Sequence, residues 1–262
     1  MKEEKVFRCV ILGNTQLDDD GLFFRLELSP PGWQRWAPGQ FVMVRGEAAD
    51  TELTWARPFC ISNSTDECLT IYYQVVGRGT RELAKLTKGE TVLLWGPLGN
   101  KFVIEPDKPT VLLAGGMGLA PFLGYSLIHP NPQNLSLEFG HRLPIGCYPF
   151  REILGAIDAA SYIETCLEDR EQFLSLVENR IKSVAADGLV IACGPLPFLR
   201  TVKNISEKYK ARTQLSLETR MACGVGACLG CVVKRQRPED QEPLNVQTCT
   251  CGPNFWADQI II

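Results

Sequence analysis

The chain has 262 residues, of which 45% are hydrophobic and 22% are charged, and its formal net charge is −3. This length suits one large domain or two to three smaller ones, with enough apolar content for a substantial core. The slightly negative charge offers no basic footprint for nucleic acid, so we expect no nucleic-acid partner.

Short strands separated by turns are predicted over the first part of the chain. Gly and Pro cluster between apolar runs, and one helix, 80–86, is entered through Gly77-Arg78-Gly79. Many short strands at this spacing predict a small antiparallel β-barrel over residues 1–104. The predicted strands are 7–12, 22–28, 40–45, 69–75 and 91–95.

A polar segment with two prolines, 105–109, is predicted to link the barrel to a different architecture. Beyond it, short apolar runs alternate with helical stretches, which predicts a parallel sheet with helices on both faces. We expect this α/β domain to span 108–210, and 211–262 to form a third, small lobe. The predicted strands are 111–114, 135–139, 162–165 and 189–192, and the predicted helices are 120–128, 151–157, 171–181 and 197–209.

One uncharged stretch, 110–128, is about long enough to cross a bilayer. Its first half carries Gly115, Gly116 and Gly118, which interrupt the helical period, so a strand–turn–helix unit is predicted instead of a membrane span. The first residues lack the charged start and apolar run of a signal peptide, and we therefore expect a cytoplasmic location.

Four cysteines dominate the predicted lobe. Cys223, Cys228 and Cys231 have the spacing C-x4-C-x2-C, and Cys249 follows after a longer gap. This is the plant-type spacing that holds a [2Fe–2S] cluster in four thiolates. A structural zinc site and free thiols are the alternatives. Zinc sites usually pair two C-x2-4-C motifs, and Cys249-Thr250-Cys251 is too tight to be the second of them. Spacing alone does not choose between Cys249 and Cys251 as the fourth ligand.

Two segments of the predicted barrel favour an anion-binding cradle. Arg57-Pro58-Phe59-Cys60 precedes a strand, and an arginine at a strand edge can hold a phosphate. Gly79 and Thr80 lie where a helix opens, and the free N–H groups of a helix start bind anions. Each pattern alone is common in loops and caps. Their order on a barrel predicts a site for the phosphate tail of a cofactor.

A glycine turn in the second domain is a candidate nucleotide site. Gly115, Gly116 and Gly118 follow a predicted strand and precede a helix, which allows close backbone approach to a dinucleotide. The pattern is not G-x-G-x-x-G, so a plain tight turn is the alternative. Cys193-Gly194-Pro195 ends a later strand, where open α/β sheets bind ligands.

We predict no catalytic side chain. The chain contains two histidines, His129 and His141, and no evident Ser–His–Asp set. Hydride and electron transfer belong to cofactors, and the protein supplies their position and electrostatics.

Five motifs and their order along the chain resemble those of the ferredoxin–NADP reductase superfamily. They are R-P-x-[SC]-I-S, G-x-G-T, G-P-L-G-N (96–100), G-G-x-G-x-A-P and C-G-P. The tail M-A-C-G-V-G-A-C-L-G-C, with a later C-x-x-G-P, resembles one branch, the electron-transfer subunits of class 1B dihydroorotate dehydrogenase. The resemblance covers essentially the whole chain, and the cysteine tail is its most specific part.

The resemblance implies an oxidoreductase subunit that binds FAD and a [2Fe–2S] cluster and uses NAD as co-substrate. It implies a partner, the FMN-containing catalytic subunit of dihydroorotate dehydrogenase, in a heterotetramer with two copies of each chain. Electrons from that subunit would pass through the cluster and FAD to NAD+, in pyrimidine biosynthesis. A reductase subunit of a hydrogenase, sulfide dehydrogenase or transhydrogenase complex, and a non-enzymatic iron–sulfur redox sensor, are the alternatives.

The resemblance also assigns residues. It places FAD contacts at Arg57, Pro58, Phe59, Cys60, Tyr72, Tyr73, Gln74, Gly79 and Thr80. It places the cluster ligands at Cys223, Cys228, Cys231 and Cys249, because Cys249 lies at the family's distance before Gly-Pro. Cys60 stands where the family usually has Ser, which weakens one expected hydrogen bond to the flavin. Gln74 stands where Arg is common, which removes one expected phosphate partner.

Overall fold

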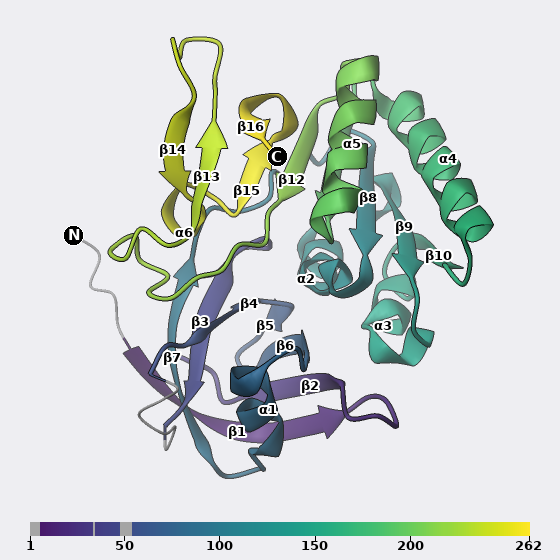
Figure 1. Ribbon diagram of the computed structural model, residues 1–262. Coiled ribbons are helices and arrows are strands. Elements are labelled where there is room, and N and C mark those ends of the chain that lie inside the picture. The colour runs from purple at the N-terminus through teal and green to yellow at the C-terminus, as the bar shows by residue number, and fades with distance from the viewer. Residues whose placement is uncertain (1–5, 34, 48–53) are drawn as a thin grey trace.

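The computed structural model describes residues 6–33, 35–47 and 54–262. It confirms the expected order of an antiparallel β-barrel, an α/β domain and a cysteine-rich tail (Figure 1). The barrel lies at one end of the molecule, and the tail and the α/β domain lie side by side above it.

The N-terminal part is one antiparallel sheet that coils around its own core. Its strands are β1 (Val6–Gln16), β2 (Phe23–Leu28), β3 (Phe41–Gly46), β4 (Arg57–Cys60), β5 (Asn63–Ser64), β6 (Leu69–Gln74) and β7 (Thr91–Leu98). Among the described residues their order is β4-β3-β7-β1-β2-β6-β5. Strand β2 shows the cause of the fold: Leu26 and Leu28 are fully buried, whereas Arg25 and Glu27 alternate with them and form an ion pair of 2.8 Å on the other face.

Helix α1 (Arg78–Lys85) packs on this sheet through Leu83, which belongs to the barrel core. Asn14 of β1 holds the end of the helix, because its Nδ2 donates to the carbonyl oxygens of Leu83 and Leu86, at 2.9 Å each. Those carbonyls lie at the C-terminal end of the helix, where the Leu83 carbonyl also accepts the N–H of Leu86 at 3.2 Å. The contact fixes α1 on the barrel and, with it, the helix start near Gly79.

The second part is an α/β layer structure. Its sheet contains β8 (Thr110–Gly115), β9 (Leu135–His141), β10 (Asp158–Ile163), β11 (Leu189–Cys193), β12 (Thr213–Ser216) and β15 (Asn254–Trp256), in the order β10-β9-β8-β11-β12-β15. The first five strands are parallel, and β15 pairs antiparallel with β12. The helices are α2 (Ala120–Ile128), α3 (Phe150–Leu154), α4 (Leu167–Val184) and α5 (Leu196–Tyr209).

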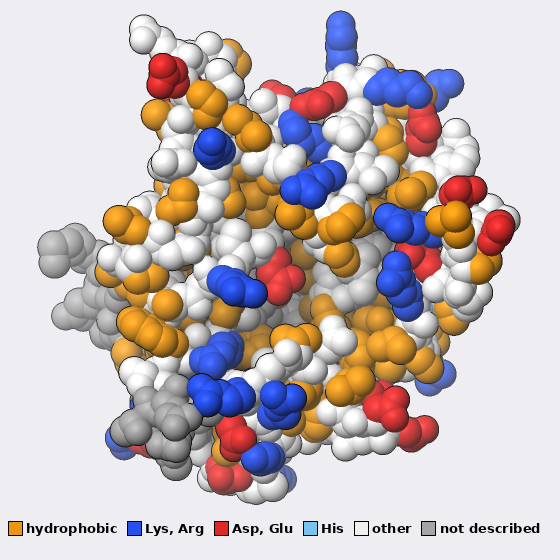
Figure 2. Space-filling model, viewed as in Figure 1, with side chains coloured by type: hydrophobic (Ala, Val, Ile, Leu, Met, Phe, Trp, Pro, Cys, Tyr) orange, Lys and Arg blue, Asp and Glu red, His pale blue; other side chains and the backbone are white. Residues whose placement is uncertain are grey.

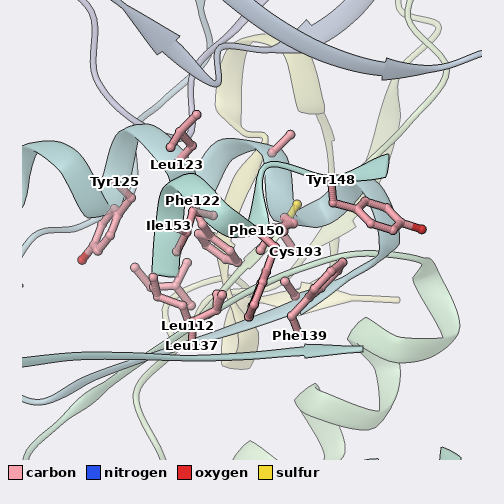
Figure 3. Packing of buried hydrophobic residues seen from close by; sticks show 14 of the residues in the cluster. Leu112, Phe122, Leu123, Tyr125, Leu137, Phe139, Tyr148, Phe150, Ile153 and Cys193 are labelled. Carbon is pink, nitrogen blue, oxygen red and sulfur yellow. The ribbon is translucent and has the colours of Figure 1, made fainter. Parts of the chain in front are cut away.

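Alternation along the strands builds one core on each face of this sheet. On β8, Leu112 and Ala114 face the side of α2 and α3, where Phe122 and Phe150 pack (Figure 3). On the same strand, Val111 and Leu113 face the side of α4 and α5. Both faces are therefore covered, as the all-apolar strands predicted. Within the described ranges, no helix is long and apolar enough to cross a membrane.

The tail contains more regular structure than its sequence indicates. β13 (Val232–Arg235), β14 (Leu244–Gln247) and β16 (Ile260–Ile261) form a small antiparallel sheet, and α6 (Thr248–Cys251) follows β14. The central sheet also differs from expectation, because it takes in β12, beyond residue 210, and β15 from the tail itself. The tail is therefore joined to the α/β domain by strand pairing.

The barrel and the α/β domain share a core. Phe23 and Tyr72 of the barrel are buried together with residues of α2 and α3, and the ring of Phe23 lies 5.4 Å from that of Tyr148. The Tyr72 hydroxyl donates to Glu152 Oε1 of α3 at 2.7 Å. This hydrogen bond to a carboxylate joins the two units and raises the pKa of Tyr72, as does burial, the larger cause.

We predict that Tyr72→Phe lowers the free energy of unfolding by about 2 kcal/mol, since a hydrogen bond to a charged group contributes about 1.5–3 kcal/mol. Denaturant unfolding of the purified protein measures this. Tyr209→Phe is the matched control, because its hydroxyl donates to Glu178 at a similar 2.7 Å but between two helices of one domain. We expect a smaller loss in Tyr209→Phe, because Tyr209 is partly exposed whereas Tyr72 is buried. An equal loss in both variants, or no loss in Tyr72→Phe, would contradict a special role at the interface.

Candidate functional site

The four predicted cluster cysteines lie together as two pairs. The Cys223 Sγ accepts hydrogen bonds from the backbone N–H groups of Val225 and Cys228, at 3.4 Å each, and the Cys228 thiol lies against it. The Cys249 thiol lies against that of Cys231 in the same way. In the part of the chain that the structure describes, no three metal-binding side chains converge on one ion position. Two pairs match the needs of two irons, each of which takes two thiolates in a [2Fe–2S] cluster.

The loop around Cys223 favours a thiolate. Burial raises the pKa of Cys223, but the N–H groups of Val225, Cys228 and Ala227 outweigh burial and lower the pKa to about 7. Gly224 and Gly226 make this wrapping possible, with φ of 74° and 83°. A Cβ at Gly224 would lie 2.5 Å from Met43 Cγ, so the loop also needs glycine there for its contact with the barrel.

Burial separates the two candidates for the fourth ligand. Cys249 is 2% exposed and packs with Cys231, whereas the side chain of Cys251 is exposed. Burial is the main cause that raises the pKa of the Cys249 thiol to about 12, followed by its contact with Cys231. The charge of two irons would offset that cost. This arrangement favours Cys249, the choice that the family resemblance implies.

The predicted phosphate cradle has a physical basis in one contact. The Arg57 guanidinium lies over Gly79, where a Cβ would sit 2.4 Å from Arg57 Nε, so any larger residue would displace the guanidinium. Arg57 Nη1 also donates to the carbonyl oxygen of Trp55. A cation is thereby held at the N-terminal end of α1, whose dipole also favours anions. Thr80 has a structural task there, since its Oγ1 accepts the N–H groups of Val76 and Gly77 at 2.9 and 3.1 Å.

The tyrosines assigned to the flavin are used elsewhere. The Tyr72 ring is buried in the core between the two domains. Tyr73 is buried in the barrel core, stacked on Phe24 at 5.4 Å, and its hydroxyl donates to Asn14 Oδ1 at 3.1 Å. Phe59 packs edge-on against Tyr73 at 5.7 Å and remains half-buried. Gln74 and all four residues of β4 are partly exposed.

Cys60 and Cys193 lie near enough for the charge of Cys60 to act on Cys193. Cys60 ends β4, Cys193 ends β11, and the charges of Cys60 and Glu218 act on the Cys193 thiol. Burial is the largest cause that raises both pKa values, that of Cys60 to about 12, with Glu218 adding to it. Both side chains are therefore neutral thiols at physiological pH, and a single carboxylate lies near them.

The glycine turn of the α/β domain lies directly against the end of β11. A Cβ at Gly118 would be 2.2 Å from the Cys193 carbonyl oxygen, and a Cβ at Gly115 would be 3.1 Å from Pro195 Cδ. These two glycines are required by packing. Gly116, with φ of 54°, has open space around it and is the position of the turn that a ligand can approach. The turn and Cys193-Gly194-Pro195 thus form one edge of the sheet, as expected for neighbouring parallel strands.

The sequence reasoning did not identify Glu218 or Thr219. Both follow β12 directly, at the carboxyl end of a sheet strand, where α/β ligands bind. The Thr219 Oγ1 is buried and has no hydrogen-bond partner in the described part of the protein, so a polar edge of a bound group would satisfy it. The sequence analysis did not predict β12, and it is the end of this strand that places Glu218 and Thr219 at the sheet edge.

Figure 2 shows the face on which these elements meet. The surface is hollowed between the barrel and the α/β domain, an acidic side chain lies at the edge of the hollow, and Lys and Arg side chains gather on the barrel side. The Arg57–Gly79 contact provides a cation at a helix start and Thr219 an unpartnered hydroxyl, which are groups that suit a phosphate and a polar ring edge, so these residues fit a flavin nucleotide.

Solved structures share this fold. The structure of an NADH-dependent reduced ferredoxin–NADP oxidoreductase, studied for flavin-based electron bifurcation, aligns with a TM-score of 0.78 and 20% identity over 97% of this chain and 89% of that one. A ferredoxin–NADP+ reductase from Neisseria gonorrhoeae, with bound FAD and NADP, aligns with a TM-score of 0.62 and 18% identity over 79% of this chain and 92% of that one. The fold is therefore that of the ferredoxin–NADP reductase class of oxidoreductases.

Sequence comparison narrows the class to a family. A family model, the iron–sulfur cluster binding domain of dihydroorotate dehydrogenase B, matches residues 218–261. The electron transfer subunit of dihydroorotate dehydrogenase B (NAD(+)) from Caldanaerobacter subterraneus subsp. tengcongensis is 34% identical over 86% of this chain and 87% of its own length. The corresponding homolog from Aquifex aeolicus is 31% identical over 96% and 97%. The chain belongs to the family of dihydroorotate dehydrogenase B electron transfer subunits.

We predict that Cys249→Ser loses the iron and the visible absorbance of the cluster, whereas Cys251→Ser keeps both, because Cys249 alone of the two packs against Cys231. Iron and acid-labile sulfide, determined on anaerobically reconstituted protein, measure the difference. Iron loss in Cys251→Ser with retention in Cys249→Ser would reverse the assignment of the fourth ligand.

A second prediction concerns the cradle. Gly79→Ala should displace the Arg57 guanidinium and weaken FAD binding by about tenfold, the factor that corresponds to about 1.4 kcal/mol for one charge-assisted hydrogen bond. Titration of the apoprotein with FAD, followed by flavin fluorescence, measures the affinity. Gly77→Ala is the control, since a Cβ there would meet nothing within 4 Å. Equal FAD affinities in Gly79→Ala and Gly77→Ala would show that Arg57 does not bind the phosphates of FAD.

Proposed function

We propose that this chain passes electrons from the FMN of a dihydroorotate dehydrogenase catalytic subunit to NAD+, with FAD and a [2Fe–2S] cluster as its bound carriers. FAD exchanges two electrons as hydride or one electron at a time, whereas the cluster exchanges one at a time. Together the two carriers connect the hydride chemistry of NAD+ to single-electron transfer. The observation that carries the proposal is the double thiol pair, Cys223 with Cys228 and Cys231 with Cys249, set against the barrel that holds Arg57 and Gly79.

The side chains contribute position and charge. Arg57 and the start of α1 would hold the FAD phosphates, and Cys60 with Cys193 would border the reacting edge of the flavin as neutral thiols. Glu218 is the one carboxylate whose charge acts on both thiols. The turn at Gly116 and the end of β11 would take the nicotinamide nucleotide, because they lie at the carboxyl ends of adjacent parallel strands.

The division of the chain follows from these roles. We propose a flavin unit over 1–104, a nucleotide unit that starts at 108 and includes β12 and β15, and a cluster unit between those two strands. The family resemblance supports an assembly of two copies of this chain with two catalytic subunits. The cytoplasmic location expected from the sequence stays a prediction.

The proposal predicts a split of activities. The isolated, reconstituted chain should oxidise NADH with ferricyanide as acceptor and should not oxidise dihydroorotate, because no side chain on it is assigned to orotate chemistry. Addition of the catalytic subunit should then produce dihydroorotate-dependent reduction of NAD+. Anaerobic spectrophotometry at 340 nm follows both reactions, and native mass spectrometry of the complex gives the stoichiometry.

Two outcomes would overturn the proposal. A chain with full FAD and iron content that does not turn over NADH favours the redox sensor. A chain that oxidises NADH but accepts no electrons from the dihydroorotate dehydrogenase subunit favours a reductase of another complex.

A further inference from the structure

The motif Gly96-Pro97-Leu98-Gly99-Asn100 has no assigned task in the proposed function, although it is half-buried and covers the end of β7 and the two residues after it. The structure shows what it contacts. A Cβ at Gly99 would lie 2.6 Å from Pro253 Cδ and 2.7 Å from the Gly252 carbonyl oxygen. The motif therefore lies against the cysteine tail at van der Waals distance, just beyond the proposed ligand Cys249.

Asn100 is tied to this part of the tail by several hydrogen bonds. Its backbone N–H donates to the Gly252 carbonyl at 2.7 Å, and its Nδ2 donates to the carbonyls of Asn254 at 2.7 Å and Cys251 at 3.3 Å. Its Oδ1 accepts the N–H of Asn254 at 3.0 Å. One side chain of the barrel thus holds the segment that carries the fourth cysteine.

Trp95, five residues earlier, holds the other half of the cluster site. Its indole Nε1 donates to the carbonyl oxygen of Cys223 at 3.0 Å. Trp95 also packs with Leu98 on an apolar cluster that contains Cys231 and Cys249 together with Phe41 and Met43 of β3. Both cysteine segments are therefore attached to the same end of β7.

The strand register connects this attachment to the flavin strand. Met43 of β3 lies opposite Trp95 of β7 and opposite Pro58 of β4. Phe41 lies opposite Leu98 and Cys60 in the same way. Residues directly opposite in antiparallel strands point to the same face, with Cβ atoms about 4.5–5.5 Å apart. Two side-chain rows thus run from β7, beneath the cluster cysteines, to the β4 residues that border the proposed flavin site.

We propose that the end of β7 fixes the separation between the cluster and the flavin, with Trp95 and Asn100 as positioning residues for electron exchange between them. The inference rests on the proposed function for its redox partners. Electron exchange slows steeply as the distance between two carriers grows. If a cysteine loop moves away from β7, the cluster moves away from the flavin, and the exchange slows even when both carriers stay bound. The indole N–H of Trp95 and the amide of Asn100 are the side-chain hydrogen bonds that add to the apolar packing in holding that distance.

The central test uses Trp95→Phe, which removes the N–H and keeps an aromatic ring. Trp36→Phe is the matched control, because its Nε1 donates to a carbonyl at a similar 2.8 Å, but to Ser64 within the barrel. NADH supplies two electrons as hydride, and one of them then passes to the cluster. Anaerobic stopped-flow measures the two steps separately, from the flavin and the cluster absorbance.

We expect Trp95→Phe to keep wild-type iron, FAD and rate of flavin reduction, and to lower the flavin-to-cluster rate several-fold, because the loop that carries Cys223 is then displaced. Amide hydrogen exchange over 223–231 should become about fivefold faster in the apoprotein, the factor that corresponds to a lost hydrogen bond of about 1 kcal/mol, and this reports the position of the loop without any redox step. Trp36→Phe should change neither quantity. Asn100→Ser should produce the same pair of effects, with exchange faster over 249–254.

Unchanged exchange and an unchanged second step in both Trp95→Phe and Asn100→Ser would overturn the inference. Loss of iron in these variants would also overturn it, since the two residues would then serve cluster assembly and not position. These outcomes differ from failure of the proposed function, which would show as no NADH turnover in the wild-type chain.

Discussion

The packing of the cysteine tail against β3 and β7 is the constraint on which the rest of the structure depends. The tail has no large core of its own: its buried cysteines share an apolar cluster with Phe41 and Met43 of the barrel. A small lobe of this kind gains stability from a neighbour and from a bound cluster. The same contact that stabilises the lobe also sets where its sulfurs lie relative to β4.

A second set of contacts fixes the barrel against the α/β domain. The barrel and the α/β domain share the core around Phe23 and Tyr72, and Arg212 of the sheet binds Glu105 of the linker through two hydrogen bonds of 2.8 and 2.9 Å. The Arg212 guanidinium also lies 5.5 Å from the centre of the Trp256 ring on β15. The barrel, the linker and the α/β sheet, including β15 of the tail, are therefore tied to one another by several contacts.

The sequence predicted elements well where local signals were strong. Helix α2 was predicted with its observed bounds, because a glycine turn precedes it and an apolar run continues to Ile128. The pattern of short strands and turns was sufficient for the barrel, and the cysteine spacing for the paired thiols. Strand β4 was not among the predicted strands, since it is only four residues long and half-buried throughout.

Other features depended on long-range pairing, which local patterns do not record. β12 and β15 lie in one sheet although they are separated by the whole cluster segment, so the central domain was expected to end too early. Motif position assigned Tyr72 and Tyr73 to the flavin, but it does not say which face of a strand a side chain occupies. Their rings pack in two different cores, and their assignment to the flavin stays a prediction. Glu218 belongs to no motif, and it was identified only by the effect of its charge on the thiols of Cys60 and Cys193.

The pairing of β12 with β15 has a consequence for the origin and engineering of the cluster segment. The N–H of Leu217 donates to the carbonyl of Pro253 at 2.9 Å, so the chain leaves the sheet and returns to it at almost the same place. Residues 218–252 are thus an excursion inserted at one sheet edge. An excursion with adjoining ends can be gained, lost or exchanged for another redox module while the sheet beneath it keeps its connectivity.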